Sequence, residues 1–225
     1  MPILGIDGNK CVQCEECVHD CPKFLFSRGN SGLVEFADPY NSCLQCGHCV
    51  AVCPTDAILR RNMEDVESFP GIETPEHLVN YVNFFHLLQA KRSIRRYKKD
   101  IVPQTVLDQI FAAIRYAPAG SNSRTITYTL ISDPSKIHTL SEMASELFVL
   151  KGIFGPVYGQ HVQQKINRGL DPIFCGAPHV LIADSQDEMG FDIVNATVAL
   201  TYGMLAAETL GVEHAGLGCS RGQRG

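Results

Sequence analysis

Apolar and polar residues follow helix and strand patterns along the last two thirds of the chain. Between Pro103 and Tyr116 the apolar residues recur at helical spacing, so they lie on one side of a predicted helix. Residues 125–132 alternate between apolar and polar side chains, as in a half-buried strand. A second strand is predicted over residues 179–183. Helices that alternate with a few strands indicate an α+β fold.

Three further segments complete this pattern. A helix is predicted to begin at Thr74, because Thr can cap a helix and Pro75 suits its first position. Another helix follows Asp133, and the last one, about residues 187–210, is apolar on nearly every side and is expected to be buried all round. Residues 150–172 are rich in Gly, Gln and charge, and they predict a mobile excursion that could cover a site.

The first 60 residues are organised differently. Short strands are expected within residues 1–10 and 33–37, and short helical turns over 15–20 and 47–52. The two halves repeat with equivalent cysteines 32 residues apart, which indicates a duplicated βαβ-like unit. The predicted organisation is a small domain over residues 1–60, a linker over 61–74 and a second domain over 75–225.

One cysteine motif occurs twice before residue 54 and contains eight of the ten cysteines. The copies are Cys11-x-x-Cys14-x-x-Cys17-x-x-x-Cys21-Pro22 and Cys43-x-x-Cys46-x-x-Cys49-x-x-x-Cys53-Pro54. Three thiolates at three-residue spacing can surround one face of a cubic iron–sulfur cluster, because the tight loops turn each sulfur inward. The motif therefore indicates iron–sulfur chemistry.

Zinc and disulfide bonds are the alternatives for these cysteines. Structural zinc sites usually use two Cys-x-x-Cys pairs with a longer spacer, whereas here three cysteines run together and a fourth precedes proline. Disulfides need an oxidising compartment, and the N-terminal residues lack a basic region followed by an apolar signal core. A cytoplasmic location is expected.

The stretch over about residues 1–60 resembles bacterial two-cluster ferredoxins. In that family the cysteine before proline ligates the neighbouring cluster. The resemblance implies two [4Fe–4S] clusters, the first held by Cys11, Cys14, Cys17 and Cys53 and the second by Cys43, Cys46, Cys49 and Cys21.

Composition sets limits on the partners. The 225 residues are 45% hydrophobic, enough for a substantial core, and the formal net charge is −5. This charge gives no bulk attraction to nucleic acid or to anionic lipid, and no apolar run is long enough to cross a bilayer. Neither nucleic acid nor a membrane is expected as a partner.

A basic segment over residues 91–99 contains six basic residues in nine. Such a run is often only a solvated face. However, a flavin mononucleotide (FMN) carries a phosphate dianion, and the guanidinium groups of Arg92 and Arg95 with the hydroxyl of Ser93 would bind it. Asn122 in the following loop could bond a flavin ring edge, and the alternative is that this loop merely ends a helix.

From about residue 75 the chain resembles the FMN-dependent nitroreductase family. The matching pieces are Arg92–Arg95, Ala117–Asn122, Gly176–Pro178 and Leu205–Gly211. The resemblance implies a homodimer with FMN at the subunit interface. The family usually continues beyond the final helix, so the chain, ending at Gly225, is expected to be truncated. By position, the FMN-binding residues would be Lys91, Arg92, Ser93 and Arg95 on the phosphate side and Pro118, Gly120 and Asn122 near the ring.

The leading hypothesis is an oxidoreductase of nitroreductase type. An external low-potential donor would reduce the clusters, and FMN would reduce a small acceptor such as a nitroaromatic, a quinone or an activated alkene. No Gly-x-Gly-x-x-Gly fingerprint is present, which favours a ferredoxin-type donor over a nicotinamide. No catalytic acid or base is assigned. The alternatives are an electron carrier or redox sensor with a non-catalytic flavin domain, and a more specialised flavin reaction such as reductive dehalogenation.

Overall fold

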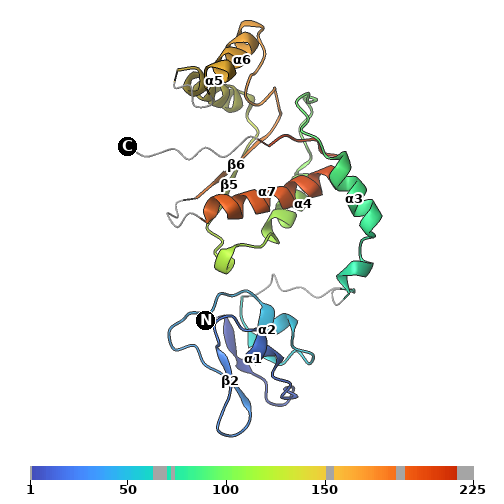
Figure 1. Ribbon diagram of the computed structural model, residues 1–225, viewed down its shortest axis with the longest axis vertical. Helices are drawn as coiled ribbons and strands as arrows, with labels where there is room; N and C mark the ends of the chain where they lie inside the picture. The colour runs from blue at the N-terminus through green and yellow to red at the C-terminus, as the bar shows by residue number, and fades with distance from the viewer. Residues whose placement is uncertain (1, 63–69, 72–73, 151–154, 186–190, 217–225) are drawn as a thin grey trace. The chain divides into compact units, whose positions relative to one another are not determined.

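The computed structural model describes residues 2–62, 70–71, 74–150, 155–185 and 191–216 (Figure 1). It divides into two compact units. Unit 1 contains Met1–Val79 and Gly120–Ser123, and unit 2 contains Asn80–Ala119 and Arg124–Gly225. The predicted linker over residues 61–74 falls mostly outside the described residues, so the domain boundaries stay a prediction.

Unit 1 consists of short strands and two short helices. They are β1 (Ile3–Ile6), α1 (Glu16–Asp20), β2 (Phe26–Arg28), β3 (Val34–Phe36), α2 (His48–Ala51) and β4 (Ile58–Arg60). Strand β1 pairs antiparallel with β4, and β2 pairs antiparallel with β3. Each pair therefore joins a strand from one half of the repeat to a strand from the other half.

The duplication predicted from the cysteines is confirmed in the backbone. Positive φ angles recur in residue pairs that lie 32 positions apart, namely Gln13 and Gln45, Glu15 and Gly47, and Phe24 and Asp56. Helices α1 and α2 follow the second pair in each half. Strands β2 and β4 were not predicted, because neither Phe26–Arg28 nor Ile58–Arg60 alternates between apolar and polar residues.

The core of unit 1 is small and includes cysteines. Ile3 and Phe26 are 2% and 3% exposed, and the rings of Phe26 and Phe36 pack with centroids 5.1 Å apart. Cys17 and Cys49 are buried in the same cluster of side chains. The loops that carry the cysteines are therefore packed against the apolar core of unit 1.

Unit 2 combines an antiparallel strand pair with helices, as the predicted α+β fold class requires. Its elements are α3 (Tyr81–Ala90), α4 (Gln104–Arg115), β5 (Thr127–Ile131), α5 (Pro134–Leu150), α6 (Pro156–Asn167), β6 (Val180–Asp184) and α7 (Asp192–Thr209). Strands β5 and β6 pair antiparallel over their full lengths. Helix α4 packs against α7, and α5 against α6 (Figure 1). The predicted helix 103–116 and both predicted strands are confirmed.

Helix α7 differs from its prediction. It buries a face of small residues, including Ala196, Ala199 and Gly203, against α4, while Val194 is 60% exposed. A helix that is apolar all round was expected to be buried all round, but small residues allow close approach on one face only. The first part of the predicted span, residues 187–190, lies outside the described residues.

Two other predictions were wrong in part. Helix α3 begins at Tyr81 and not at Thr74, because Asn80 Oδ1 accepts the backbone N–H of Val82 at 2.8 Å, while the Thr74 side chain caps nothing. Residues 75–77 form only a 3₁₀ turn. The predicted mobile excursion contains helix α6, which begins after Gly155 with a proline at its start.

Candidate functional site

Two cavities in unit 1 are lined by the cysteines that the ferredoxin resemblance groups together. Cavity A is lined by Cys11, Cys14, Cys17 and Cys53. Cavity B is lined by Cys21, Cys43, Cys46 and Cys49. Each cavity therefore takes three cysteines from one motif and the fourth from the other.

The two cavities differ in their remaining walls. Val12, Val34 and Ile58 give cavity A apolar walls. Cavity B also has apolar walls, but it includes the cationic side chain of Lys23 and the imidazole of His48. The two sites are thus equivalent in their sulfur donors and different in their electrostatics.

The thiols of each set influence one another. Burial raises the pKa of Cys17, and the neighbouring Cys11, Cys14 and Cys53 raise it further. Burial likewise raises the pKa of Cys49 to about 12, with Cys43, Cys46 and Cys21 adding to the effect. These buried thiols are protonated at neutral pH in the absence of a metal, so binding a metal or cluster would release protons.

Backbone N–H groups point at two of the sulfurs in the same way in both halves. Leu25 N donates to Cys21 Sγ at 3.4 Å, and Ala57 N donates to Cys53 Sγ at 3.2 Å. Although burial acts to raise the pKa of Cys53, the N–H groups of Ala57 and Thr55 lower it overall. Both cysteines precede a proline, and in each motif the backbone N–H donor is the residue four positions after the cysteine.

Asp38 shapes the loop before the second motif and was missed by the sequence reasoning. It is 6% exposed, and its carboxylate accepts the backbone N–H groups of Ser42 at 2.7 Å and Cys43 at 3.0 Å. These donors, Ser42 first, lower the pKa of Asp38. Its position five residues before a cysteine, next to Pro39, was the only signal in the sequence.

The proposed phosphate-binding residues lie after the end of helix α3 in unit 2. Arg92 Nη1 donates to the carbonyl oxygens of Gln89 at 2.6 Å and Lys91 at 2.7 Å, so this guanidinium caps the helix end. Ser93 and Arg95 are exposed to solvent, and Lys91 is half-buried. Arg95 and Ser93 thus have their polar groups open to a ligand, whereas Arg92 is engaged with its own helix.

The loop after α4 is divided between the two units. Pro118 belongs to unit 2 and is exposed. Gly120 and Asn122 belong to unit 1, where Asn122 Nδ2 donates to the carbonyl oxygens of Leu44 at 2.9 Å and Gln45 at 3.1 Å. The three residues predicted to lie near the flavin ring are therefore divided between the two units.

A histidine links three segments of unit 2. His179 Nε2 accepts the backbone N–H of Val102 at 3.0 Å, and its Nδ1 lies 2.7 Å from Ser132 Oγ. An Nε2 that accepts must be unprotonated, which places the proton on Nδ1. Burial lowers the pKa of His179. The neutral ring therefore joins the start of β6 to the end of β5 and to the segment before α4.

A buried carboxylate holds the start of helix α7. Asp192 is 8% exposed, and its two oxygens accept hydrogen bonds from the hydroxyls of Thr125, at 2.7 Å, and Ser185. These hydroxyls, Ser185 first, lower the pKa of Asp192. Asp192 and His179 hold the framework of unit 2, and neither was singled out from the sequence.

Among the described residues, no group of three or more His, Cys, Asp or Glu side chains is placed to hold a single metal ion. No helix in the described part of the chain is long and apolar enough to cross a membrane.

Comparison with known families identifies both parts of the chain. Residues 10–58 match the 4Fe-4S dicluster domain, and residues 88–220 match the nitroreductase family. The chain belongs to the nitroreductase family, with a 4Fe–4S dicluster ferredoxin domain in front of the family domain.

Individual relatives cover parts of the chain. Iodotyrosine deiodinase 1 of Sus scrofa is 30% identical over 87 residues, which is 37% of this chain and 30% of the relative. The FMN reductase [NAD(P)H] of Bacillus subtilis is 27% identical over 149 residues, 60% of this chain and 53% of the relative. A nitroreductase structure with bound FMN from Bacteroides fragilis has 25% identity and a TM-score of 0.48, covering 59% of this chain and 67% of that one. The chain thus spans about half or less of the length of these two curated relatives.

Proposed function

We propose that this protein is an iron–sulfur flavoprotein oxidoreductase that passes electrons from a low-potential donor through two [4Fe–4S] clusters to FMN. The observation that carries the proposal is the pair of four-cysteine cavities in front of a nitroreductase-family domain.

The donor sets fit clusters better than zinc. A tetrahedral zinc site holds four sulfurs about 2.3 Å from one ion. Here each motif supplies three cysteines at three-residue spacing and gives its fourth to the other cavity, whereas a structural zinc site usually uses two Cys-x-x-Cys pairs. A [4Fe–4S] cluster takes four thiolates around a cubic core, three of them from one such run. Cys11, Cys14, Cys17 and Cys53 would hold one cluster, and Cys43, Cys46, Cys49 and Cys21 the other.

FMN would be bound through the basic segment and the loop after α4. The exposed Arg95 and Ser93 would bond the phosphate, with Lys91 and Arg92 beside them adding positive charge. Pro118, from the same unit, would lie near the ring. The similarity to the FMN reductase of B. subtilis supports FMN as the flavin. The chemistry that FMN supplies when bound is the conversion of single electrons into a two-electron reduction.

A homodimer in the cytoplasm is part of the proposal. On helix α7, Ile193, Val194 and Tyr202 are 40%, 60% and 43% exposed. On α3, Tyr81 is 72% exposed. Val194 and Tyr202, eight positions apart, share one side of α7, and exposed apolar surface favours an interface with a second copy. Light scattering on the purified chain should give the mass of two copies, whereas the mass of one copy would contradict the dimer.

The acceptor is proposed to be a nitroaromatic, a quinone or an activated alkene. The similarity to iodotyrosine deiodinase 1 favours reductive dehalogenation as a second candidate reaction. Rapid mixing of the reduced protein with a nitroaromatic, a quinone or a halogenated tyrosine, each in a separate experiment, distinguishes the two candidate reactions. Faster reoxidation by the first two supports the reductase, and halide release from the third supports dehalogenation.

Cofactor analysis after anaerobic purification tests the composition. The proposal predicts about eight iron and eight sulfide per chain for two cubic clusters, together with FMN. Iron and sulfide without FMN would instead support an electron carrier or sensor. Zinc without sulfide would contradict the proposal.

A further inference from the structure

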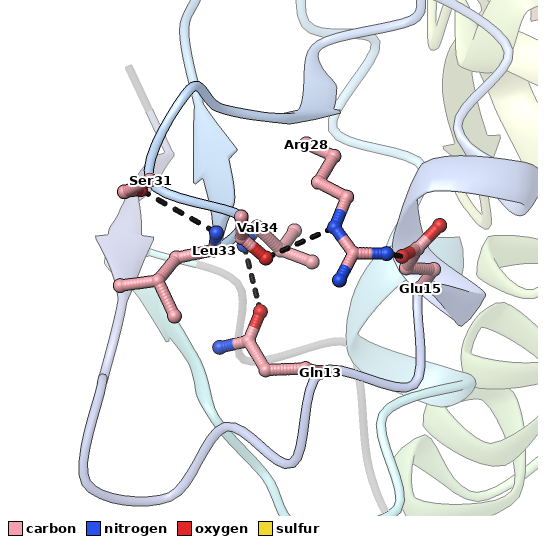
Figure 2. Close-up of polar contacts among 7 residues, drawn as sticks. Gln13, Glu15, Arg28, Ser31, Leu33 and Val34 are labelled. Atoms are coloured by element: carbon pink, nitrogen blue, oxygen red, sulfur yellow. Dashed lines mark hydrogen bonds and ion pairs between the residues drawn. The ribbon is translucent and has the colours of Figure 1, made fainter.

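The side chain of Gln13 bridges the first cysteine motif and strand β3 (Figure 2). Its Oε1 accepts the backbone N–H of Val34 at 2.7 Å. Its Nε2 donates to Cys11 Sγ at 3.4 Å. Among the hydrogen bonds to cysteine sulfur in the described residues, this is the one in which a side-chain nitrogen is the donor.

The orientation of the Gln13 amide follows from its partners. A backbone N–H can only donate, so the amide atom that faces Val34 N has to be the oxygen. The other amide atom, Nε2, is then the one that faces Cys11 Sγ. Exchanging the two atoms would place two donors together at Val34, so the hydrogen-bond network determines the assignment.

A second contact holds the same loop. Arg28 on β2 donates to Glu15 Oε1 at 2.7 Å and to the carbonyl oxygen of Gly32 at 3.0 Å (Figure 2). Glu15 lies two residues after Gln13, so two side-chain contacts join this loop to the β2–β3 hairpin. The loop that carries Gln13 is therefore held to the hairpin at two positions.

We propose that Gln13 raises the reduction potential of the cluster in cavity A, an inference that rests on the proposed function. In the one-electron couple, the oxidised cluster takes one electron from the reductant, and the negative charge on the core and its thiolates increases. A hydrogen bond donated to a thiolate stabilises the more negative, reduced form more strongly. Gln13 is thus a tuning residue that acts through Cys11.

Gln45 is the matched residue in the other half. It lies 32 positions later, has a φ of 53° against 59° at Gln13, and lines cavity B. In the part of the chain that the structure describes, its side-chain amide has no hydrogen bond to a cysteine sulfur. The two glutamines therefore share a backbone conformation and differ in their contact with sulfur.

Three variants of the full chain test the inference. Gln13→Glu keeps the acceptor for Val34 N and replaces the donor with an oxygen. Gln13→Met removes both contacts at similar length, and Gln45→Met is the matched control. Each protein is purified anaerobically and titrated with dithionite while the reduced clusters are followed by electron paramagnetic resonance.

One of the two midpoint potentials should fall in both Gln13 variants and stay unchanged in Gln45→Met. The expected size is about a tenfold lower ratio of reduced to oxidised cluster at fixed potential, or about 59 mV for one electron. Hydrogen exchange gives a second readout, because the Val34 amide should stay protected in Gln13→Glu and lose protection in Gln13→Met.

The failures are distinguishable. A wild-type protein without iron and sulfide would overturn the proposed function and this inference with it. Clusters whose potentials are the same in wild type and both Gln13 variants would overturn the inference alone. An equal fall of that same midpoint potential in Gln45→Met would also overturn the inference.

Discussion

Gly203 on α7 and Ile114 on α4 are so close that a Cβ on Gly203 would lie 2.7 Å from Ile114 Cγ1. Ile114 is 5% exposed, so it has little room to move away. The absence of a side chain at position 203 therefore allows the two helices to pack against each other. This contact fixes the end of α4, which leads into the loop proposed to approach the flavin.

Gly203→Val should lower the free energy of unfolding by about 1–3 kcal/mol, the usual effect of overpacking a core. Thr201→Val introduces the same side chain at an exposed position of the same helix, and it should change stability by less than about 0.5 kcal/mol. Urea unfolding measures both. Adding Ile114→Ala to Gly203→Val should recover part of the loss, and a purely additive double variant would argue against the contact.

Cys53→Ala should remove roughly half of the iron and sulfide, because it removes one of four thiolates from cavity A and none from cavity B. Cys21→Ala should have the same effect on the cluster of cavity B. Cys175→Ala, outside both cavities, is the control and should keep full iron content. Full iron retention in Cys53→Ala would contradict the exchange of the fourth cysteine.

Arg95→Ala should weaken FMN binding by roughly 10- to 100-fold, since a hydrogen bond to a charged group contributes about 1.5–3 kcal/mol. Titration of deflavinated protein with FMN, followed by flavin fluorescence, measures the dissociation constant. Arg96→Ala removes an equally exposed charge next to the proposed set and should change affinity much less. Equal losses in both variants would indicate general electrostatic attraction and not a phosphate contact.

Stability should decrease as the pH falls below about 6.5, the ordinary histidine value. Burial lowers the pKa of both His179 and His214, so the unfolded chain binds protons that the folded chain does not. The contribution is complete above pH 6.5 and is lost progressively toward the lower folded-state pKa.

Urea unfolding between pH 7.5 and 5 checks this dependence. His179→Asn should flatten the slope of stability against pH, because it removes one of the two histidines whose pKa burial lowers. The same slope in wild type and His179→Asn would contradict the account of the His179 contacts.

The strongly periodic elements of unit 2 could be predicted because their apolar faces are buried locally. Helix α4 is the best example, because Ile114 on its predicted face is buried, although Leu107, also buried, was not among the residues predicted for that face. The start of α3 could not be predicted, because Thr74 and Asn80 are both good caps and only the contacts decide between them. Helix α6 was hidden by its polar composition, and the faces of α7 depend on which small residues meet α4.

In unit 1 the spacing of the cysteines carried most of the information. The repeat follows from the motif, whereas Asp38 and Gln13 act through loop and strand contacts that spacing alone does not reveal. Gln13 meets Val34 across 21 residues of sequence, on a strand too short for its partner to be inferred. Side chains that tune the cluster sites therefore required the structure.

The most direct test of the account is a single-turnover experiment on the anaerobically purified full chain. Dithionite-reduced protein is mixed with a quinone or nitroaromatic, and cluster and flavin absorbance are followed with FMN bound and with FMN removed. The account predicts that the clusters reoxidise rapidly only when FMN is bound. Equal cluster reoxidation without FMN, or a bound flavin that stays reduced with every acceptor, would contradict it.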